Sequence, residues 1–403
     1  MTQAALEGVT VLDFTQAVQG PLATQRLGDM GAEVIKIERT GGEIYRSSSG
    51  DRPSIGNDNP LFHGYNRNKK SLALDLKTEE GHDICMKLAK NADVVVSNYR
   101  PGVMERLDLG YEDFKSVNEQ IIYCQATGYG LTGPYTDHPG QDLLIQSLTG
   151  VMSVTGWQDN PPIPAGFAVV DVHASTILAY SIMVALFHKE RTGEGQRVDS
   201  NLLNAGLDLQ SGGLTSFLNS ELSVERAQSG IASPWASAPY GVYETKDGHV
   251  TLSTRPNMEM IAEELGLPHL TEYGPDKMRD NRDEIWREMN KKFKEKTTDE
   301  WLENLDRAEA WIAPVHSYDD VINDPQVEHN EIIKKVEHPV AGDIELVDIP
   351  AKFSKTPGEV EVPSPVVGDS NRELLESIGY SAEQIEQFKD TGIINSTDLE
   401  EET

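Results

Sequence analysis

One carboxylate in the sequence, that of Asp171, stands where it could take part in chemistry. It follows the apolar residues 167–170 and precedes the long apolar segment 174–187. A charge between two apolar runs needs a physical reason, because a buried carboxylate is costly unless it is paired. It could cap a helix by satisfying free backbone N–H groups, or it could be a nucleophile held at the helix start. Spacing favours the cap, and in either role we expect the helix start to stabilise Asp171 as an anion.

The overall charge excludes two classes of partner. The chain has 35 Lys and Arg residues against 66 Asp and Glu residues, a formal net charge of −31. Nucleic acids and anionic membranes both need a cationic protein face, so neither is expected as a partner. An acidic balance of this size is typical of a halophile-like surface, which bears on solubility rather than on the reaction.

One stretch runs against this acidic background. Between residues 39 and 70, six basic side chains outnumber three acidic ones. A local excess of cations predicts an anionic ligand, although each side chain could equally be a solvated surface charge. The basic residues are Arg39, Arg46, Arg52, Arg67, Lys69 and Lys70, and the acidic ones are Glu43, Asp51 and Asp58.

A glycine pattern further on imitates a dinucleotide-binding site. Gly128, Gly130 and Gly133 match G-x-G-x-x-G after a predicted strand, but in a true site this pattern opens a helix. Here Pro134 and Pro139 follow and interrupt helix formation. We therefore expect a glycine-rich active-site loop and no bound nicotinamide or flavin.

Strand-like and helix-like segments alternate through the first 200 residues. This alternation predicts βαβ units and a doubly wound, Rossmann-like α/β domain. Pro21 begins the first predicted helix, at the carboxyl end of the first strand, where phosphate groups are often bound; an ordinary tight connection explains it equally well. The predicted strands are residues 9–14, 33–37, 71–76, 93–97, 120–126 and 196–199.

A length of 403 residues exceeds a comfortable single core, so two domains are expected. We predict a large domain from residues 1–200, a linker at 201–226, a smaller inserted α/β domain at 227–325, and a return to the large domain at 326–403. The proline- and serine-rich loop 229–239 and a predicted hairpin at 241–253 support the insertion.

Neither a membrane span nor a metal site is expected. The apolar run 174–187 falls short of the roughly 20 residues that cross a bilayer, so it predicts a buried helix. No signal peptide is apparent, which favours a cytoplasmic location. Cys85 and Cys124 lie in apolar segments and suggest neither a disulfide nor a metal ligand set.

Five segments together resemble one family, the class III coenzyme A transferases, also called the formyl-CoA transferase or carnitine CoA-transferase family. The resemblance covers almost the whole chain and is specific. The segments are VLDFTQAVQGPLATQRLGDMGAEVIKIE, NRNKKSLALDLKTEEG, ADVVVSNYRPGVMERLDLGY, ATGYGLTGPY and RTGEGQRVDSNLL.

The resemblance implies that Asp171 is the nucleophile, which reverses the preference for a cap. Its carboxylate would attack an acyl-CoA thioester and then carry CoA as an aspartyl thioester. Asp142 would orient or polarise nearby, and Gln141 beside it completes the expected catalytic set. CoA enters as a substrate, and no tightly bound cofactor or metal is expected. The residues expected to bind CoA are Gln16, Ala17, Val18, Arg39, Lys69, Asn98, Tyr99 and Arg106.

Two departures limit the resemblance. Racemases of this family have G-H-D where this chain has Gly140-Gln141-Asp142, so the histidine base for α-proton exchange is missing. His138 or His173 could replace it, although a structural role is the simpler interpretation of each. The polyglycine flap of formyl-CoA transferases is also not evident, and residues 229–234 could fill its place.

The expected protein is therefore an interlocked homodimeric enzyme acting on an acyl-CoA and a carboxylic acid. Succinyl-CoA as donor and mesaconate or a similar dicarboxylate as acceptor are guesses based on the halophile-like composition. Two alternatives stay open: an acyl-CoA racemase or epimerase on the same scaffold, and a non-catalytic CoA-binding subunit.

Overall fold

The computed structural model describes residues 4–47, 54–221, 224–253, 256–305 and 307–395. The chain divides into two compact units. The large unit comprises Met1–Ile145, Ala168–Leu209 and Gln326–Thr403, and the small unit comprises Gln146–Phe167 and Gln210–Pro325. The small unit thus includes residues 146–167 as well as the stretch from residue 210, and the predicted linker at 201–226 contains two helices, α10 (Leu202–Asp208) and α11 (Ser211–Leu218).

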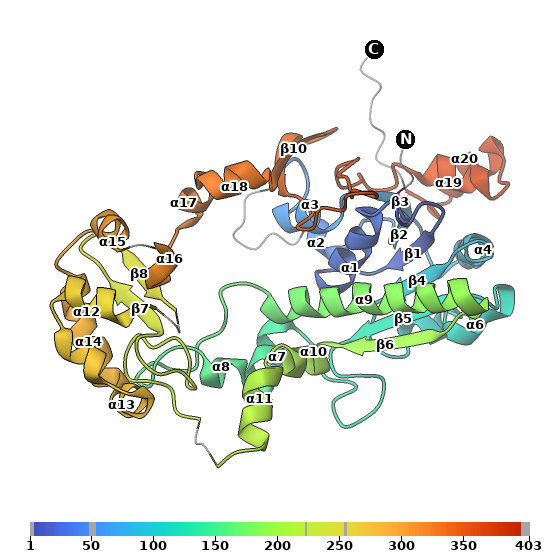
Figure 1. The fold of residues 1–403 in the computed structure, drawn as a ribbon. Helices are drawn as coiled ribbons and strands as arrows, with labels where there is room; N and C mark the ends of the chain where they lie inside the picture. The colour runs from blue at the N-terminus through green and yellow to red at the C-terminus, as the bar shows by residue number, and fades with distance from the viewer. Residues whose placement is uncertain (1–3, 48–53, 222–223, 254–255, 306, 396–403) are drawn as a thin grey trace. The chain divides into compact units, whose positions relative to one another are not determined.

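A six-stranded parallel sheet forms the centre of the large unit (Figure 1). Its strand order is β3-β2-β1-β4-β5-β6, and every neighbouring pair is parallel, which confirms the predicted α/β class. The order reverses between β1 and β4, and ligands of such sheets bind beyond the carboxyl ends of the strands at this reversal. The strands are β1 (Thr10–Phe14), β2 (Glu33–Glu38), β3 (Lys69–Ala73), β4 (Val94–Ser97), β5 (Ile122–Thr127) and β6 (Arg197–Asn201).

Helices cover both faces of this sheet. On one face, α1 (Gln19–Gly28) and α9 (Val169–Thr192) pack on a buried cluster that includes Val34, Val94 and Leu178. On the other face, a second cluster includes Leu12, Ile35 and Tyr123. It is covered by α4 (Glu79–Ala89), α5 (Val103–Arg106), α6 (Tyr111–Val117), α19 (Asn371–Ser377) and α20 (Ala382–Asp390).

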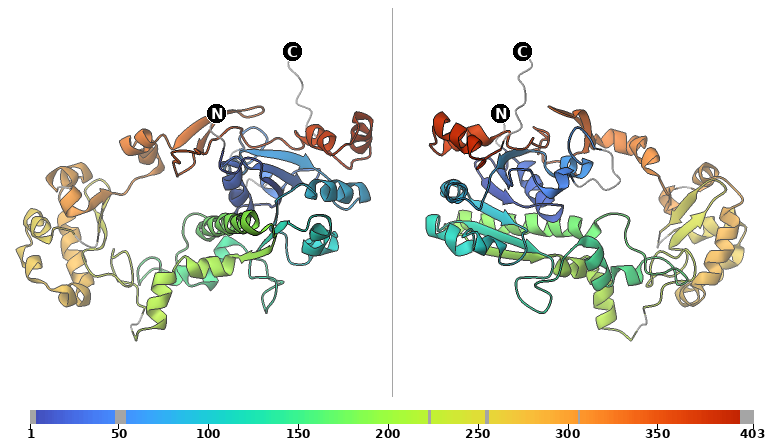
Figure 2. Two further views of the ribbon diagram at one scale, coloured as in Figure 1. Left: turned by 45° about the vertical axis from the view of Figure 1, so that its right-hand side comes forward. Right: turned by 180° about the vertical axis from the view of Figure 1, so that it is seen from behind.

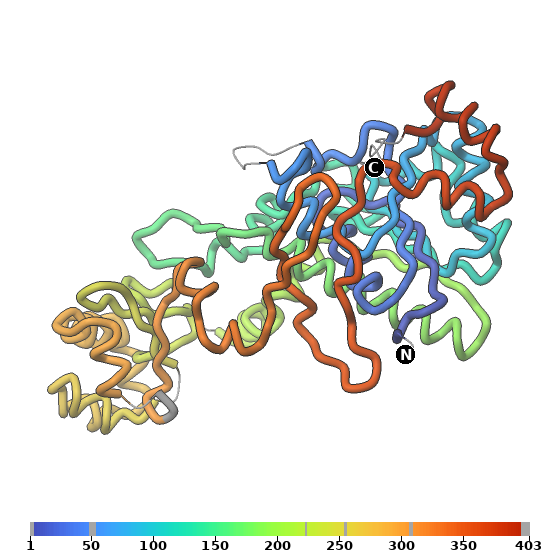
Figure 3. Tube along the Cα trace, turned by 90° about the horizontal axis from the view of Figure 1, so that it is seen from above, coloured from blue at the N-terminus to red at the C-terminus, as the bar shows by residue number. Residues whose placement is uncertain are grey.

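The C-terminal part of the chain returns to the first strands (Figure 3). The Asn68 side chain donates to the Glu359 carbonyl and accepts from the N–H groups of Glu361 and Val362. Shorter elements complete the large unit: α2 (Ile44–Ser47), α3 (Pro60–Tyr65) and the antiparallel pair β10 (Ile333–His338) and β11 (Gly342–Val347). Two helices cross the boundary between the units, α7 (Asp142–Leu148) and α18 (Pro325–Asn330).

Helix α9 is longer and less buried than predicted. It has 24 residues, so among the described helices it alone is long and apolar enough to cross a bilayer. One side packs on the sheet through Leu178 and Ile182, and such packing accounts for apolar character without a membrane. The opposite side is exposed, with Tyr180 at 66% and Phe187 at 63%. The prediction of a buried helix is therefore wrong for half of its surface.

The small unit is built around an antiparallel sheet in the order β7-β8-β9 (yellow to orange in Figures 1 and 2). The predicted hairpin is confirmed as β7 (Gly241–Glu244) and β8 (His249–Leu252), and β9 (Ile312–Pro314) adds the third strand. Tyr243, Phe293 and Trp301 lie in its core. The surrounding helices are α8 (Val151–Val154), η1 (Pro268–Glu272), α12 (Met258–Leu265), α13 (Pro275–Asp280), α14 (Arg282–Phe293), α15 (Thr298–Asn304), α16 (Arg307–Ala310) and α17 (Tyr318–Ile322).

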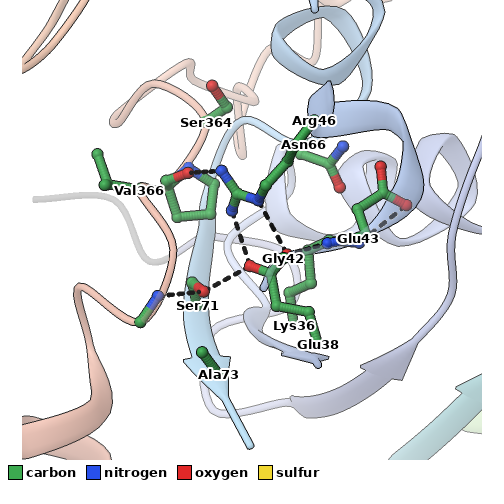
Figure 4. Close-up of polar contacts among 12 residues, drawn as sticks. Lys36, Glu38, Gly42, Glu43, Arg46, Asn66, Ser71, Ala73, Ser364 and Val366 are labelled. Atoms are coloured by element: carbon green, nitrogen blue, oxygen red, sulfur yellow. Dashed lines mark hydrogen bonds and ion pairs between the residues drawn. The ribbon is translucent and has the colours of Figure 1, made fainter. Parts of the chain in front are cut away.

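A buried ionic cluster joins β2, α2 and the C-terminal segment of the large unit (Figure 4). The Arg46 guanidinium donates to both carboxylate oxygens of Glu38, at 2.9 and 2.7 Å, and to the Pro365 carbonyl at 2.9 Å. Ser71 Oγ donates to Glu38 and accepts from Gly368 N–H. Burial alone would raise the pKa of Glu38, but Arg46 holds it below its usual value.

We predict that Arg46→Ala lowers the free energy of unfolding by about 3–5 kcal/mol, because it leaves the buried Glu38 carboxylate unpaired. Lys70→Ala is the matched control: its ion pairs with Glu33 and Glu373 are half exposed and should contribute less than about 1 kcal/mol. Urea unfolding followed by circular dichroism measures both. Equal losses in the two variants would contradict this account of the cluster.

Candidate active site

The loop after β1 lies beside the reversal of strand order. Its Gln16 N–H donates to Asn98 Oδ1 at 2.9 Å, and Asn98 Nδ2 donates back to the Gln16 carbonyl at 2.7 Å. The Ala17 N–H donates to Glu43 Oε2 at 3.0 Å. Loops that follow β1, β2 and β4 are thereby joined at one point, and the predicted residues Gln16, Ala17 and Asn98 are brought together.

A small cavity of about 70 Å³ lies at this junction. It is lined by side chains that follow β1, β2 and β4, as expected of a ligand site at a topological switch point. Tyr99 is one of them, and burial raises the pKa of its hydroxyl to about 12, so the group stays a hydrogen-bond donor. The lining includes Thr15, Gln16, Arg39, Glu43, Ile44 and Tyr99.

Two predicted cations lie on the surface near these loops. Arg39 follows β2 and is exposed, and its Nε donates to the Gly42 carbonyl at 2.6 Å. Arg106 ends α5 and is also exposed; a Cβ added at Gly102 would lie 3.0 Å from its Nη1. Both guanidinium groups can therefore meet an anion from solvent.

Lys69 occupies a different environment. Its ammonium is completely buried and donates to Asp13, to the Pro21 carbonyl and to Asn66, each at 2.9 Å. Burial, only partly offset by Asp13, lowers the pKa of Lys69 to about 8. All three protons are used within the protein, so Lys69 has none left for a phosphate.

Other cations of the predicted basic stretch also form ion pairs within the protein. Arg46 pairs with Glu38, and the buried Arg67 donates through Nε and Nη2 to the two oxygens of Asp29, each at 2.8 Å. Arg52 lies outside the described residues. The stretch is therefore largely a buried ionic network rather than a cationic surface.

A second group of predicted residues meets at the start of α9. The helix begins at Val169, so Asp171 lies within its first turn, and its N-cap residue Ala168 makes no side-chain cap. Instead Asp142 Oδ1 accepts the N–H groups of Val170 and Asp171, at 2.8 and 3.2 Å. The cap interpretation of Asp171 is wrong because Asp142, at the start of α7, performs that task.

This arrangement changes the charge state expected for Asp171. Burial, and secondly the negative charge of Asp142, raise the pKa of Asp171 to about 7. Within the described residues, its carboxylate has no hydrogen-bond partner. The raised pKa of Asp171 runs against the expectation that the helix start stabilises its anion, and its causes are desolvation first and Asp142 second.

The glycine loop 128–140 leads directly into this pair. No helix follows Gly128 before α7, so these glycines do not open a helix as the dinucleotide fingerprint requires. A Cβ added at Gly140 would lie 2.5 Å from the Gly128 Cα, so the two ends of the loop are pressed together. Gln141 follows this stem, is exposed, and precedes α7. The stem therefore fixes where Asp142 enters its helix.

The two histidines considered as alternative bases have other partners. His173 Nε2 lies 2.8 Å from Asp208 Oδ2, which ties α9 to α10. His138 stacks on Tyr135 in the glycine loop, with ring centroids 5.0 Å apart. The structural interpretation of each histidine stays a prediction.

One site residue was missed by reasoning from sequence. Glu43 was counted only as an acid within the basic stretch, yet it holds the Ala17 N–H beside the cavity. Its position in a Gly-Gly-Glu turn directly after β2 was the available signal, because loops at the carboxyl ends of parallel strands carry the ligand contacts.

Comparison with known proteins decides the family. The family model for CoA-transferase family III matches residues 6–371. The chain belongs to this family. It is an enzyme family, so the alternative of a non-catalytic subunit is set aside, and CoA thioesters are the substrates of this transferase.

Several named relatives cover the transferase almost end to end. Succinyl-CoA:glutarate CoA-transferase of Mus musculus is 34% identical, over 96% of this chain and 90% of the relative. Succinyl-CoA:mesaconate CoA-transferase of Haloarcula hispanica is also 34% identical, over 93% of this chain and 96% of the relative. Formyl-CoA:oxalate CoA-transferase of Streptomyces coelicolor is 31% identical, over 98% of this chain and all of the relative.

Solved structures share the fold of the transferase. A CAIB/BAIF family protein from Brucella suis superposes with a TM-score of 0.82 at 26% identity, over 94% of this chain and 100% of that chain. Rv3272 from Mycobacterium tuberculosis superposes with a TM-score of 0.79 at 30% identity, over 92% of this chain and 99% of that one. Within the described residues, no three His, Cys, Asp or Glu side chains gather as a metal site requires.

We predict that Asp171→Asn raises the midpoint of thermal unfolding at pH 8 by at least about 1 °C and that this gain shrinks towards pH 5. Burial raises the pKa of Asp171 from 3.8 to about 7 in the folded protein, so its contribution to stability is complete below about pH 4 and is lost as pH rises from there to 7. The asparagine does not titrate. Scanning calorimetry of both proteins from pH 5 to 8 measures the difference.

The matched control for this prediction is Asp199→Asn, whose exposed carboxylate pairs with Arg197. A pH trend of the same size in this variant, or the absence of a trend in Asp171→Asn, would contradict the raised pKa.

Proposed function

We propose that this protein transfers CoA from an acyl-CoA donor to a small carboxylic acid through a covalent intermediate on Asp171. The observation that carries the proposal is the geometry at the start of α9. There the Asp171 N–H donates to Asp142 Oδ1, and the pKa of the Asp171 carboxyl group is raised to about 7. A carboxylate that the protein does not stabilise is a better nucleophile than one held by hydrogen bonds. At neutral pH a large share of Asp171 is still ionised and able to attack.

The first half of the reaction removes the acyl group from CoA. An Asp171 carboxylate oxygen attacks the thioester carbonyl carbon, the C–S bond breaks, and CoA leaves as a thiolate. The product on the enzyme is a mixed anhydride. The thiolate then attacks the Asp171 carbonyl carbon of that anhydride, which releases the donor acid and leaves CoA as a thioester on Asp171.

The second half uses the same two steps with the acceptor. The acceptor carboxylate attacks the aspartyl thioester and expels CoA thiolate, giving a new anhydride. The thiolate attacks the acceptor carbonyl, which forms the new acyl-CoA and frees the Asp171 carboxylate. Each step conserves charge, since one anion attacks and one anion leaves. Asp142 contributes by keeping the helix start in place and by disfavouring a second negative charge beside it.

We propose that CoA is bound at the switch point of the large unit. The loop residues Gln16, Ala17 and Val18 and the turn at Asn98 and Tyr99 would lie along the thioester and the pantetheine arm. The exposed cations Arg39 and Arg106 would meet the phosphates, for which guanidinium groups are suited. Support comes from the joining of these loops around one cavity.

We propose succinyl-CoA as the donor and mesaconate or a similar dicarboxylate as the acceptor. Two relatives of about 34% identity carry names with succinyl-CoA as donor, and one of them has mesaconate as acceptor. A screen of succinyl-CoA against mesaconate, glutarate and oxalate tests the choice. The racemase alternative is not favoured, because Gln141 stands where racemases of the family have their histidine and an amide cannot serve as a base.

We predict that Asp171→Asn lowers transfer activity by roughly 10³-fold or more, because the amide cannot form the anhydride. Wild-type protein incubated with succinyl-CoA and trapped with hydroxylamine or borohydride should show a modified Asp171 in peptide mass spectrometry. The control Asp199→Asn should keep both the activity and the adduct. Full activity in Asp171→Asn would sink the nucleophile assignment.

We also propose that the chain forms the homodimer that the family resemblance implies. The exposed apolar side of α9 supports this, because exposed Tyr180, Met183, Val184 and Phe187 are costly in water unless another surface covers them.

We predict that Tyr180→Asp combined with Phe187→Asp shifts the protein from dimer towards monomer, since two charges would have to be buried in the interface. Light scattering coupled to size exclusion measures the mass. Glu190→Gln, on the same helix, is the control and should leave the mass unchanged. A wild-type monomer, or a double variant that is still dimeric, would refute the assignment of this face.

A further inference from the structure

The turn that follows β1 has an unusual backbone. Ala17 adopts φ of +67°, a left-handed conformation that residues other than glycine rarely take. Such strain persists only where the surrounding structure imposes it, and it gathers at ligand sites. In this loop the strain lies beside the cavity at the switch point.

Two side chains from other loops impose this conformation. Asn98 pairs with both the N–H and the carbonyl of Gln16. Glu43 Oε2 accepts the next N–H, that of Ala17. Two consecutive peptide groups are therefore fixed from two directions, one by a residue after β4 and one by a residue after β2.

Glu43 is itself held firmly. Its own N–H donates to Glu38 Oε2 at 2.9 Å, so it belongs to the buried cluster of Figure 4. Lys36 Nζ lies 3.9 Å from Glu43 Oε2 and donates to the Thr15 carbonyl at 2.9 Å. The carboxyl group that holds the turn is thus anchored to the same strand, β2, that carries Lys36 and Glu38.

Stability does not explain why a carboxyl group occupies this position. Glu43 is only 5% exposed, and its second oxygen, Oε1, is buried without a hydrogen-bond partner among the described residues. Its neighbour Glu38 carries the same charge, and its ion pair with Lys36, at 3.9 Å, is too long for a hydrogen bond and offsets the cost of burial only in part. A buried carboxyl group with half of its acceptors empty costs free energy. Residues that cost stability in this way are typical of positions kept for function.

We propose that Glu43 is a positioning residue of the transferase, which holds the Gln16–Ala17 turn in the shape that receives the CoA thioester. The inference rests on the proposed CoA site at this turn. Glu43 acts through the Ala17 peptide and not on the reacting atoms. Its removal should therefore weaken the binding of CoA and acyl-CoA while the chemical step at Asp171 is less affected.

The test compares Glu43→Ala with Glu43→Gln in the full-length protein. Glu43→Ala should raise the KM for succinyl-CoA and the calorimetric Kd for CoA by roughly tenfold, with a smaller change in kcat. Glu43→Gln should stay within about threefold of the wild type, because the amide oxygen still accepts the Ala17 N–H. The thermal midpoint of Glu43→Ala should fall, because the variant leaves the buried Lys36 ammonium and the Ala17 N–H without this partner, so KM and Kd are measured well below that midpoint.

Asp58→Ala is the matched control. Asp58 belongs to the same cluster through Arg46, at 3.1 Å, but no hydrogen bond joins it to the turn among the described residues. Its KM and Kd should stay at the wild-type values. An equal rise in Asp58→Ala would show that cluster stability is responsible and would overturn the proposal, as would unchanged KM and Kd in Glu43→Ala.

Failure of the proposed function has a different signature. If the wild-type protein does not bind CoA in calorimetry and transfers no CoA, the CoA site itself is wrong. If the wild type binds CoA and Glu43→Ala binds it equally well, only the positioning role of Glu43 fails.

Discussion

The chemistry proposed for this transferase depends on one carboxylate that does two tasks. Asp142 accepts the first free N–H groups of α9 and so fixes the start of a 24-residue helix. The same negative charge disfavours ionisation of Asp171 in the first turn. A neutral cap such as serine would have satisfied the helix equally well. An acidic cap also opposes the stabilisation that the helix dipole offers to the Asp171 anion. A less stabilised carboxylate is a more reactive nucleophile.

The contact between Gly128 and Gly140 and the strand order of the sheet position the two groups of site residues. Gly128 directly follows β5, and its close approach to Gly140 sets the entry of the chain into α7. The reversal of strand order between β1 and β4 places the loops after these two strands side by side. The residues proposed to bind CoA are brought together in this way. Both devices act on the backbone, so the side chains that they present can vary without loss of the arrangement.

Sequence reasoning succeeded where the signal was local and failed where it was not. The alternation of strands and helices predicted the parallel sheet, and the prolines after Gly133 predicted that no helix starts there. The burial of Lys69 could not be predicted, because its partner Asp13 is 56 residues away and only the folded sheet brings them together. The start of α9 depends on Asp142, 29 residues before Asp171. Composition likewise could not show which side of α9 is covered.

Which basic side chains are buried and which are exposed bears on how so acidic a protein binds a polyanionic substrate. Arg46, Arg67 and Lys69 are each buried against a carboxylate, so these three cations shape the large unit and do not contribute to a cationic surface. In the proposed CoA site, the attraction for phosphates would fall to exposed guanidinium groups such as Arg39, acting against a net charge of −31. Salt screens the repulsion from the distant acidic surface more than it screens a direct guanidinium–phosphate contact. A chain of this charge should therefore gain affinity for CoA as ionic strength rises from low values, the opposite of the usual behaviour of cationic sites.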